Sequence, residues 1–225
     1  GDVSALPDQR RIGPDCEVYF LPRHGRPHHI PPHEVNYRAN IWLLGELGVD
    51  AIVASFAVGG IDPALALADI VVAHQIIDYT WGRAHTFYDR QHERNELRHV
   101  DFTHPFDARL NRQLVSIGAG TSLAGTLHAN GVYGCTQGPR LESAAEIDRM
   151  ERDGCTIVGM TAMPEAGLAR EAGIPYASLS LIVNPAAGRS DAPIDSASIR
   201  AAIDTGMGDV TKILAALFEC GDEFR

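Results

Sequence analysis

The residues best suited to chemistry in this sequence are cationic side chains that follow an early apolar segment. Arg23, His24 and Gly25 come directly after residues 18–21, which we interpret as a buried strand, and further histidines and prolines follow. Loops at the carboxyl ends of strands are where α/β proteins bind ligands, and clustered positive groups favour an anion. The composition is equally typical of a proline-stiffened surface loop, so the rest of the chain must separate the two interpretations.

Four other apolar segments also end in glycine or polar residues. We predict strands at residues 51–60, 131–137, 156–160 and 176–184, whose ends carry residues 55–60, 137–142, 160–161 and Asn184. The carboxyl ends of parallel strands meet at one edge of a sheet. Together with the cationic loop, these ends predict a single ligand site.

The order of the predicted elements indicates an α/β fold. A further strand is predicted at residues 68–77, and helices at residues 34–47, 108–118, 143–152, 164–172 and 196–218. Strands that alternate with helices predict a central mixed or mainly parallel β-sheet flanked by helices. We expect residues 1–225 to form a single domain, with residues 1–15 as an extended lead-in. The long polar stretch 78–107 is predicted to be a functional loop or an interface.

The charge of the chain restricts its partners. A formal net charge of -10 argues against a non-specific nucleic-acid binder, so any bound anion must meet a local cluster of positive groups. Lys212 is the only lysine in the sequence, and the cationic work therefore falls on arginine. Arginine suits the recognition of phosphate or carboxylate, because its planar fork donates two parallel hydrogen bonds.

The cysteines and the apolar segments predict an ordinary intracellular protein. Cys16, Cys135, Cys155 and Cys220 are scattered without metal-binding spacing, so we expect reduced thiols and no metal site. We find neither a leader sequence nor a long apolar span. The simplest expectation is a cytoplasmic protein that binds neither membrane nor nucleic acid.

Three motifs, taken in order, resemble those of a known enzyme family. They are residues 23–25 with 35–40 (Arg-His-Gly and Val-Asn-Tyr-Arg-Ala-Asn), residues 136–142 (Thr-Gln-Gly-Pro-Arg-Leu-Glu) and residues 159–165 (Gly-Met-Thr-Ala-Met-Pro-Glu). Their order and spacing resemble the trimeric purine nucleoside phosphorylase family, in its methylthioadenosine and methylthioinosine phosphorylase branch. The resemblance extends from about residue 18 to residue 217. It implies a nucleoside phosphorylase-like fold and a homotrimer.

The resemblance also implies a reaction. The family cleaves the N-glycosidic bond of a purine nucleoside with inorganic phosphate, which is a co-substrate, and uses no cofactor. Arg23, His24, Ala57 and Thr161 would bind phosphate, the first through its guanidinium fork and Ala57 through its backbone N–H. Met160 would lie under the ribose. The alternative for Thr161 is the N-cap of the helix that follows.

The base would be chosen by residues near the last predicted strand. The resemblance places Asn184 at the purine, where family members that act on 6-aminopurines carry aspartate, and it places Leu141, Glu142 and Ala186 in the substrate pocket. The Asn184 amide can donate to the N7/O6 side of a 6-oxopurine, and Glu142 can accept from its N1–H. The expected catalytic residues are therefore Asn184, Thr161 and His24. The expected substrate is S-methyl-5'-thioinosine, which would yield hypoxanthine and 5-methylthioribose 1-phosphate.

Some features leave other interpretations open. In the family a histidine of a neighbouring subunit closes the 5' pocket, and His99 lies at the matching position. The family's N-terminal strand and Gly-Gly-Thr-Gly turn have no counterpart in residues 1–225, and Phe56 replaces a threonine or asparagine. The alternatives are a phosphorylase for inosine and guanosine or for methylthioadenosine, a nucleosidase that uses water, and a nucleoside-binding protein without turnover.

Overall fold

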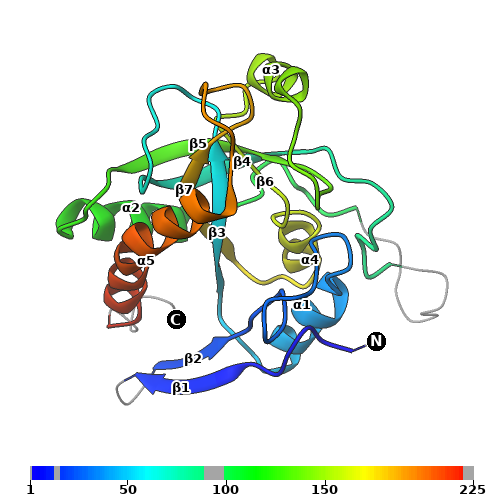
Figure 1. Ribbon diagram of the computed structural model, residues 1–225. Helices are drawn as coiled ribbons and strands as arrows, with labels where there is room; N and C mark the ends of the chain where they lie inside the picture. The colour runs from blue at the N-terminus through cyan, green and yellow to red at the C-terminus, as the bar shows by residue number, and fades with distance from the viewer. Residues whose placement is uncertain (1, 13–15, 89–98, 220–225) are drawn as a thin grey trace.

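The computed structural model describes residues 2–12, 16–88 and 99–219 and has an α/β fold with a central mixed sheet (Figure 1). The sheet closes into a barrel with the strand order β3-β6-β5-β4-β7. These strands are β3 (Ile52–Gly60), β4 (Ile70–Asp78), β5 (Leu127–Cys135), β6 (Ile157–Gly159) and β7 (Tyr176–Pro185). Each of them lies within or next to a strand predicted from the sequence, so the α/β prediction is confirmed.

The pairing of β3 is the feature of the barrel that matters for the site. β3 runs parallel to β7 along its whole length, from Ile52 to Gly60. It pairs antiparallel with β6 only at Gly59 and Gly60. In the described part of the chain, the β3 backbone before Gly59 therefore has a strand on one edge only.

The helices are α1 (Tyr37–Glu46), α2 (Ala108–Gly120), α3 (Ala144–Arg152), α4 (Glu165–Glu171) and α5 (Ser196–Glu219). Two pairs of helices lie on opposite sides of the barrel, and α3 lies apart from both at the top of Figure 1. α2 and α5 pack against each other and against β7, while α1 packs against α4 on the opposite side. Of the helices in the described ranges, none combines the length and apolar character needed to cross a membrane.

Side-chain caps explain where several helices begin. α1 begins at Tyr37, later than predicted, because the side chain of Asn36 accepts a hydrogen bond from the Ala39 N–H at 3.1 Å. The helix buries Ile41 and Leu44, whereas Trp42 is 59% exposed. The hydrogen bond to the Asn36 side chain therefore sets the first residue of the helix, which the spacing of apolar residues does not determine.

The segment before the cationic loop differs from the prediction. β2 (Cys16–Phe20) pairs with β1 (Asp8–Ile12) in a separate two-stranded ribbon that stands outside the barrel. Phe20 is 61% exposed. The prediction of a buried strand at residues 18–21 was therefore wrong. The predicted extended lead-in, residues 1–15, contains β1. A two-stranded ribbon can bury one face at most, so the apolar residues of β2 do not report a central strand.

The long stretch 78–107 has no helix or strand in its described parts, residues 79–88 and 99–107, beyond the end of β4. It is nevertheless held to the fold, because the Glu171 carboxylate accepts hydrogen bonds from the Thr86 hydroxyl and the Phe87 N–H, both at 2.7 Å. His92 and Arg98 lie outside the described residues. The stretch is therefore anchored against α4 at Thr86 and Phe87.

Two glycines of α2 provide a test of how closely this helix packs on the barrel. A Cβ atom at Gly118 would lie 2.2 Å from Leu127 Cδ1 and 3.2 Å from its Cγ, whereas one at Gly120 would meet nothing within 4 Å. We expect Gly118→Ala to lower the free energy of unfolding by about 1–3 kcal/mol, because Leu127 must move. Gly120→Ala should leave it unchanged within about 1 kcal/mol or raise it slightly. Urea unfolding of both variants checks this, and equal effects would contradict it.

Candidate active site

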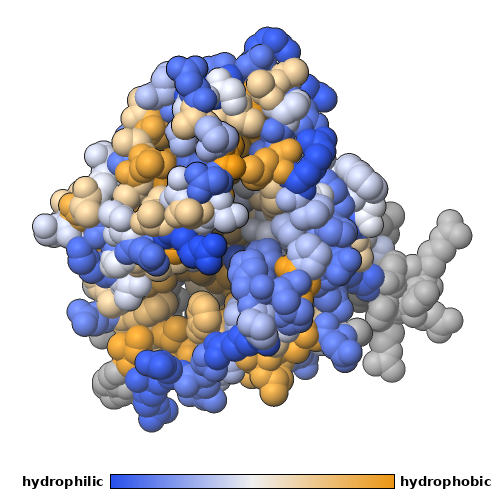
Figure 2. Space-filling view, in the orientation of Figure 1, coloured by the Kyte–Doolittle hydropathy of each residue, from blue (hydrophilic) through white to orange (hydrophobic). Residues whose placement is uncertain are grey.

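A cavity of about 1150 Å³ runs along the open edge of β3. Figure 2 shows that this face of the molecule is hollowed, with hydrophobic residues gathered below the hollow. One part of the cavity is polar, and the rest is an apolar lobe between β2, β3 and α5. Most of the residues predicted for the site line it: Arg23, His24, Ala57, Leu141, Glu142, Met160, Thr161 and Asn184.

Two predicted residues do not line this cavity. Ala186 is 3% exposed and packs in an apolar cluster with Ile61 and Ile147, and its neighbour Ala187 lines the cavity instead. His99 is exposed and is absent from the lining of its own chain's cavity. The prediction for His99 concerns the pocket of a neighbouring copy, so a single chain does not test it.

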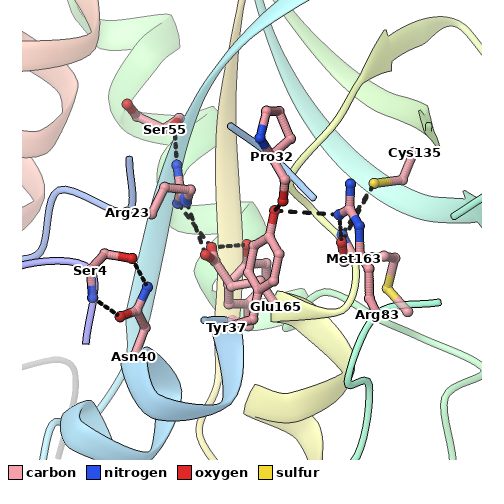
Figure 3. A network of polar contacts seen from close by, with 11 residues as sticks. Ser4, Arg23, Pro32, Tyr37, Asn40, Ser55, Arg83, Cys135, Met163 and Glu165 are labelled. Carbon is pink, nitrogen blue, oxygen red and sulfur yellow. Dashed lines mark hydrogen bonds and ion pairs between the residues drawn. The ribbon is translucent and has the colours of Figure 1, made fainter. Parts of the chain in front are cut away.

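Arg23 is the most firmly held side chain of the site (Figure 3). Its Nε and Nη2 donate to the two carboxylate oxygens of Glu165, both at 2.9 Å, and Nη1 donates to the Ser55 carbonyl at 3.1 Å. Glu165 is 4% exposed and also accepts a hydrogen bond from the Tyr176 hydroxyl at 2.8 Å. Burial alone lowers the pKa of Arg23, but the Glu165 carboxylate outweighs burial and holds that pKa above its ordinary value.

This arrangement changes the expected role of the Arg23 fork. We expected the fork to face an anion, but it holds Glu165 instead. A guanidinium has five N–H groups, so one N–H on each Nη remains after these three bonds. Arg23 can therefore donate to a ligand while its position is fixed from behind by Glu165.

Phe56 packs behind Arg23. Its ring lies under the Arg23 guanidinium, with 4.8 Å between Cζ and the ring centroid, and meets Tyr133 edge to face at 5.3 Å. The side chain is buried, in line with Ala54 and Val58 on the same face of β3. Phe56 thus supports the guanidinium through its ring, where a shorter polar side chain could not.

The backbone of β3 supplies a donor beside Arg23. The Ile52 N–H donates to the Pro175 carbonyl just before β7. Backbone N–H groups of successive strand residues point to opposite edges, so the N–H groups of Ser55 and Ala57 point away from β7. Ala57 is exposed to the cavity, and β6 reaches only as far as Gly59. The Ala57 N–H is therefore directed toward the cavity edge of the strand.

His24 is held as a neutral imidazole. Its Nδ1 lies 2.8 Å from the Ile30 carbonyl, and its ring stacks on His28 with 4.3 Å between centroids. A carbonyl can only accept, so Nδ1 carries the proton and Nε2 holds the lone pair in the neutral ring. Burial lowers the pKa of His24 below its ordinary value, and His28 and Arg23 lower it further.

Met160 and Thr161 lie on the turn between β6 and α4. The N-cap position of α4 is Pro164, and no side chain caps the helix, so the alternative of Thr161 as an N-cap is wrong. Within the described residues the Thr161 hydroxyl makes no hydrogen bond, although this residue is buried against the cavity. Gly138 packs closely on Met160, since a Cβ there would lie 2.5 Å from Sδ at a φ of +61°.

Glu142 and Asn184 approach the cavity from other strand ends. The Thr136 hydroxyl donates to Glu142 Oε1 at 2.6 Å, and the Thr136 N–H donates to the Gly159 carbonyl at 2.8 Å. Asn184 lies in β7 and pairs with Gly59 across a register shift in β3. It is therefore part of a strand and not only the start of a turn.

Sequence reasoning did not assign a role to two buried charged residues near the cavity, Glu165 and Arg83. Glu165 is the last residue of the motif at residues 159–165, and its place in that motif could have indicated a role in the site. Arg83 lies in the long stretch after β4, is 8% exposed and donates to several backbone carbonyls. No pattern in the sequence singled it out, because its partners are backbone atoms of distant segments.

The thiols and acidic groups do not form a further centre in the part of the chain described. No group of three or more His, Cys, Asp or Glu there could hold a metal ion. Cys135 and Cys155 are buried and free, Cys16 is half-buried, and Cys220 lies outside the described residues. Burial raises the pKa of Cys135 to about 12, so its thiol stays protonated.

Comparison with known proteins agrees with this geometry. The family model of the Phosphorylase superfamily matches residues 15–219. The chain is 54% identical over 199 residues to a probable S-methyl-5'-thioinosine phosphorylase of Pseudomonas syringae pv. tomato, which covers 88% of this chain and 79% of that protein. It is 44% identical over 205 residues to a 6-oxopurine nucleoside phosphorylase of Pyrococcus furiosus, over 90% of this chain and 77% of that protein.

A solved structure shares the whole architecture. Methylthioadenosine phosphorylase from Schistosoma mansoni in complex with adenine has a TM-score of 0.94 and 31% identity, over 99% of this chain and 82% of that chain. The resemblance inferred from the three motifs is thus confirmed over almost all of the sequence. With a barrel of the same form, the predicted strand ends around one cavity and a family match from residue 15 to residue 219, the chain belongs to the Phosphorylase superfamily.

Proposed function

We propose that this protein cleaves the N-glycosidic bond of a 6-oxopurine nucleoside with inorganic phosphate, and that S-methyl-5'-thioinosine is its preferred nucleoside. The observation that carries this proposal is that the residues expected to bind phosphate and those expected to bind the base line the same cavity. The names of the relatives support it, since those compared act on a methylthio nucleoside or on 6-oxopurine nucleosides.

The proposed reaction needs no nucleophile from the protein. An oxygen of phosphate forms a bond to C1' of the ribose as the bond from C1' to N9 breaks, and the electron pair leaves with the purine. Positive charge builds up on the ribose and negative charge on the base. Enzymes accelerate such a step by placing fixed charges and donors where charge develops. The products are hypoxanthine and 5-methylthioribose 1-phosphate.

The phosphate end of the site would use donors of several kinds. Arg23 keeps free N–H groups while Glu165 holds it, and the Ala57 N–H and the Thr161 hydroxyl add directional donors. His24 in its neutral form offers a lone pair on Nε2, which suits a phosphate that still carries a proton. Phosphate held in this way beneath the ribose would stabilise the positive charge on the sugar.

The base end favours a 6-oxopurine. Asn184 can donate to the N7/O6 side, which stabilises the leaving base, while Glu142 is held by Thr136 where it can accept from N1–H. A buried site built for one hydrogen-bonding pattern leaves groups unpaired with the other pattern, a penalty that can reach about 10⁴-fold. The solved neighbour in complex with adenine is a methylthioadenosine phosphorylase, so the 6-amino nucleosides belong in every assay.

We also infer that the protein works as a homotrimer in which His99 of one copy closes the 5' pocket of the next. His99 and Val100 are exposed in the single chain and lie outside its own cavity, which leaves them available to a neighbour. A monomer in sedimentation experiments at assay concentration would contradict this inference.

Phosphate dependence tests the proposed function directly. Release of the base from S-methyl-5'-thioinosine, methylthioadenosine, inosine and adenosine is measured with and without phosphate. A phosphorylase releases base only with phosphate and forms the sugar 1-phosphate. Undiminished release without phosphate would show a nucleosidase, and tight nucleoside binding with no release would show a binding protein.

Asn184→Asp should shift the preference of the enzyme from 6-oxopurine toward 6-aminopurine nucleosides. A carboxylate accepts from the N6 amino group of adenine and repels O6 of hypoxanthine, so the ratio of kcat/KM for inosine over adenosine should fall by about 10- to 100-fold. Ala187→Ser, which alters the cavity wall without a charge, is the matched control. An unchanged ratio for Asn184→Asp would show that Asn184 does not read the base.

Phosphate should raise the pKa of His24. In the free protein burial holds this pKa below the ordinary value, so the ring is neutral at pH 7. A bound phosphate anion favours the imidazolium, so the titration midpoint should move upward on adding phosphate. Histidine NMR signals followed from pH 5 to 8 check this, with His24→Gln to assign the signal. If the midpoint stays in place while phosphate binds, His24 is not in the phosphate site.

A further inference from the structure

Arg83 is a buried cation whose hydrogen-bond partners are neutral. Nη1 donates to the carbonyls of Met160, at 2.9 Å, and Met163. Nη2 donates to the carbonyls of Gln137, at 2.8 Å, and Thr136, at 3.3 Å. Nε donates to the Gln137 side chain at 3.2 Å. Within the described residues no carboxylate contacts this guanidinium, and the groups that it meets there are dipoles.

These acceptors belong to two segments that carry the site. Thr136 and Gln137 follow β5 and lead to Glu142, and the Thr136 hydroxyl holds Glu142 Oε1 at 2.6 Å. Met160 and Met163 lie between β6 and α4, on either side of Thr161. A single planar side chain thus spans the base-reading segment and the segment expected to contact ribose and phosphate.

Arg83 also reaches the cationic loop through Tyr37. Its Nη1 donates to the Tyr37 hydroxyl at 3.3 Å, and that hydroxyl donates to the Pro32 carbonyl at 2.8 Å. Figure 3 shows Arg23 and Arg83 on opposite sides of Tyr37. Because Glu165 follows the 160–164 turn and is held by Arg23, that turn is fixed from both ends by arginines.

We propose that Arg83 is a positioning residue that sets the spacing between the base-reading and the ribose-phosphate parts of the active site. This inference rests on the proposed function of those parts. A buried charge is costly unless its donors are hydrogen-bonded, and among the described residues Arg83 donates to neutral acceptors of both segments. The planar fork of arginine reaches both segments at once, whereas the compact ammonium of lysine cannot replace its bond geometry.

The variant Arg83→Lys tests the proposal through a double-mutant cycle with Glu142→Gln. A misplacement of about 1 Å can cost about 10²-fold, so kcat/KM for S-methyl-5'-thioinosine should fall by about 10- to 100-fold in Arg83→Lys. If Arg83 acts through Glu142, the same change made in Glu142→Gln should cost clearly less. A full loss in both backgrounds would overturn the proposal, because it indicates independent or purely structural effects.

Gly118→Ala is the control for lost stability, because it weakens α2 far from these segments. It should keep the kcat/KM of the unmodified enzyme when both are assayed well below their unfolding temperatures. If Arg83→Lys does not fold, Gln137→Ala removes one acceptor only, and it should lower kcat/KM by about 2- to 10-fold. No change in Gln137→Ala would count against the proposal.

A binding measurement separates this proposal from the proposed function. Calorimetry gives the Kd for hypoxanthine without turnover, and Arg83→Lys should weaken that binding while Gly118→Ala leaves it unchanged. If the unmodified protein shows no phosphorolysis but this difference is present, the reaction is wrong and the positioning role stands. If phosphorolysis is present and Arg83→Lys matches the unmodified enzyme in both assays, the positioning role is wrong.

Discussion

The active site depends on the ion pair between Arg23, whose side chain is partly buried, and the buried Glu165. Its two parallel bonds at 2.9 Å join the loop after β2 to the first residue of α4, which are distant in the sequence. A third bond ties Arg23 to β3 at the Ser55 carbonyl. Removing one partner of such a pair typically costs about 3–5 kcal/mol, because the other charge stays buried and unpaired. An intact pair of this kind adds little net stability, so its main effect here is to hold Arg23 in one position.

This pair also limits the positive charge that a chain with a net charge of -10 can present to an anion. Glu165 cancels the charge of Arg23, and His24 is neutral near pH 7 because burial lowers its pKa. In the proposed phosphate site, attraction for the anion would then come largely from directed donors, namely the remaining guanidinium N–H groups, the Ala57 N–H and the Thr161 hydroxyl. Such donors stabilise a charge at one place and add little long-range field.

Much of this arrangement could be predicted, and the remainder has two causes. The strands β3 to β7 have continuous apolar segments, and their polar ends, such as Asn184 and Thr161, follow from strand direction. β2 was misjudged because a ribbon that buries one face carries the same apolar residues as a central strand. The partners of Arg23 and Arg83 could not be read, because Glu165 and the carbonyls of Met160 and Met163 are brought near by tertiary folding. Every residue carries a backbone carbonyl, so the sequence does not show which one accepts a hydrogen bond from a distant arginine.

The incomplete strand pairing of the barrel leaves a backbone donor, the Ala57 N–H, directed toward the cavity. A backbone N–H inside a sheet is normally taken by the neighbouring strand. β6 meets β3 only at Gly59 and Gly60, so among the described residues the Ala57 N–H has no strand beside it. The register shift between Val58 and Gly59 then brings Asn184 of β7 opposite Gly59. The same short stretch of β3 thus directs one donor toward the proposed phosphate site and adjoins the asparagine that is proposed to bind the base. Closing the barrel fully along β3 would improve its backbone pairing and would remove the donor on which the proposed phosphate site depends.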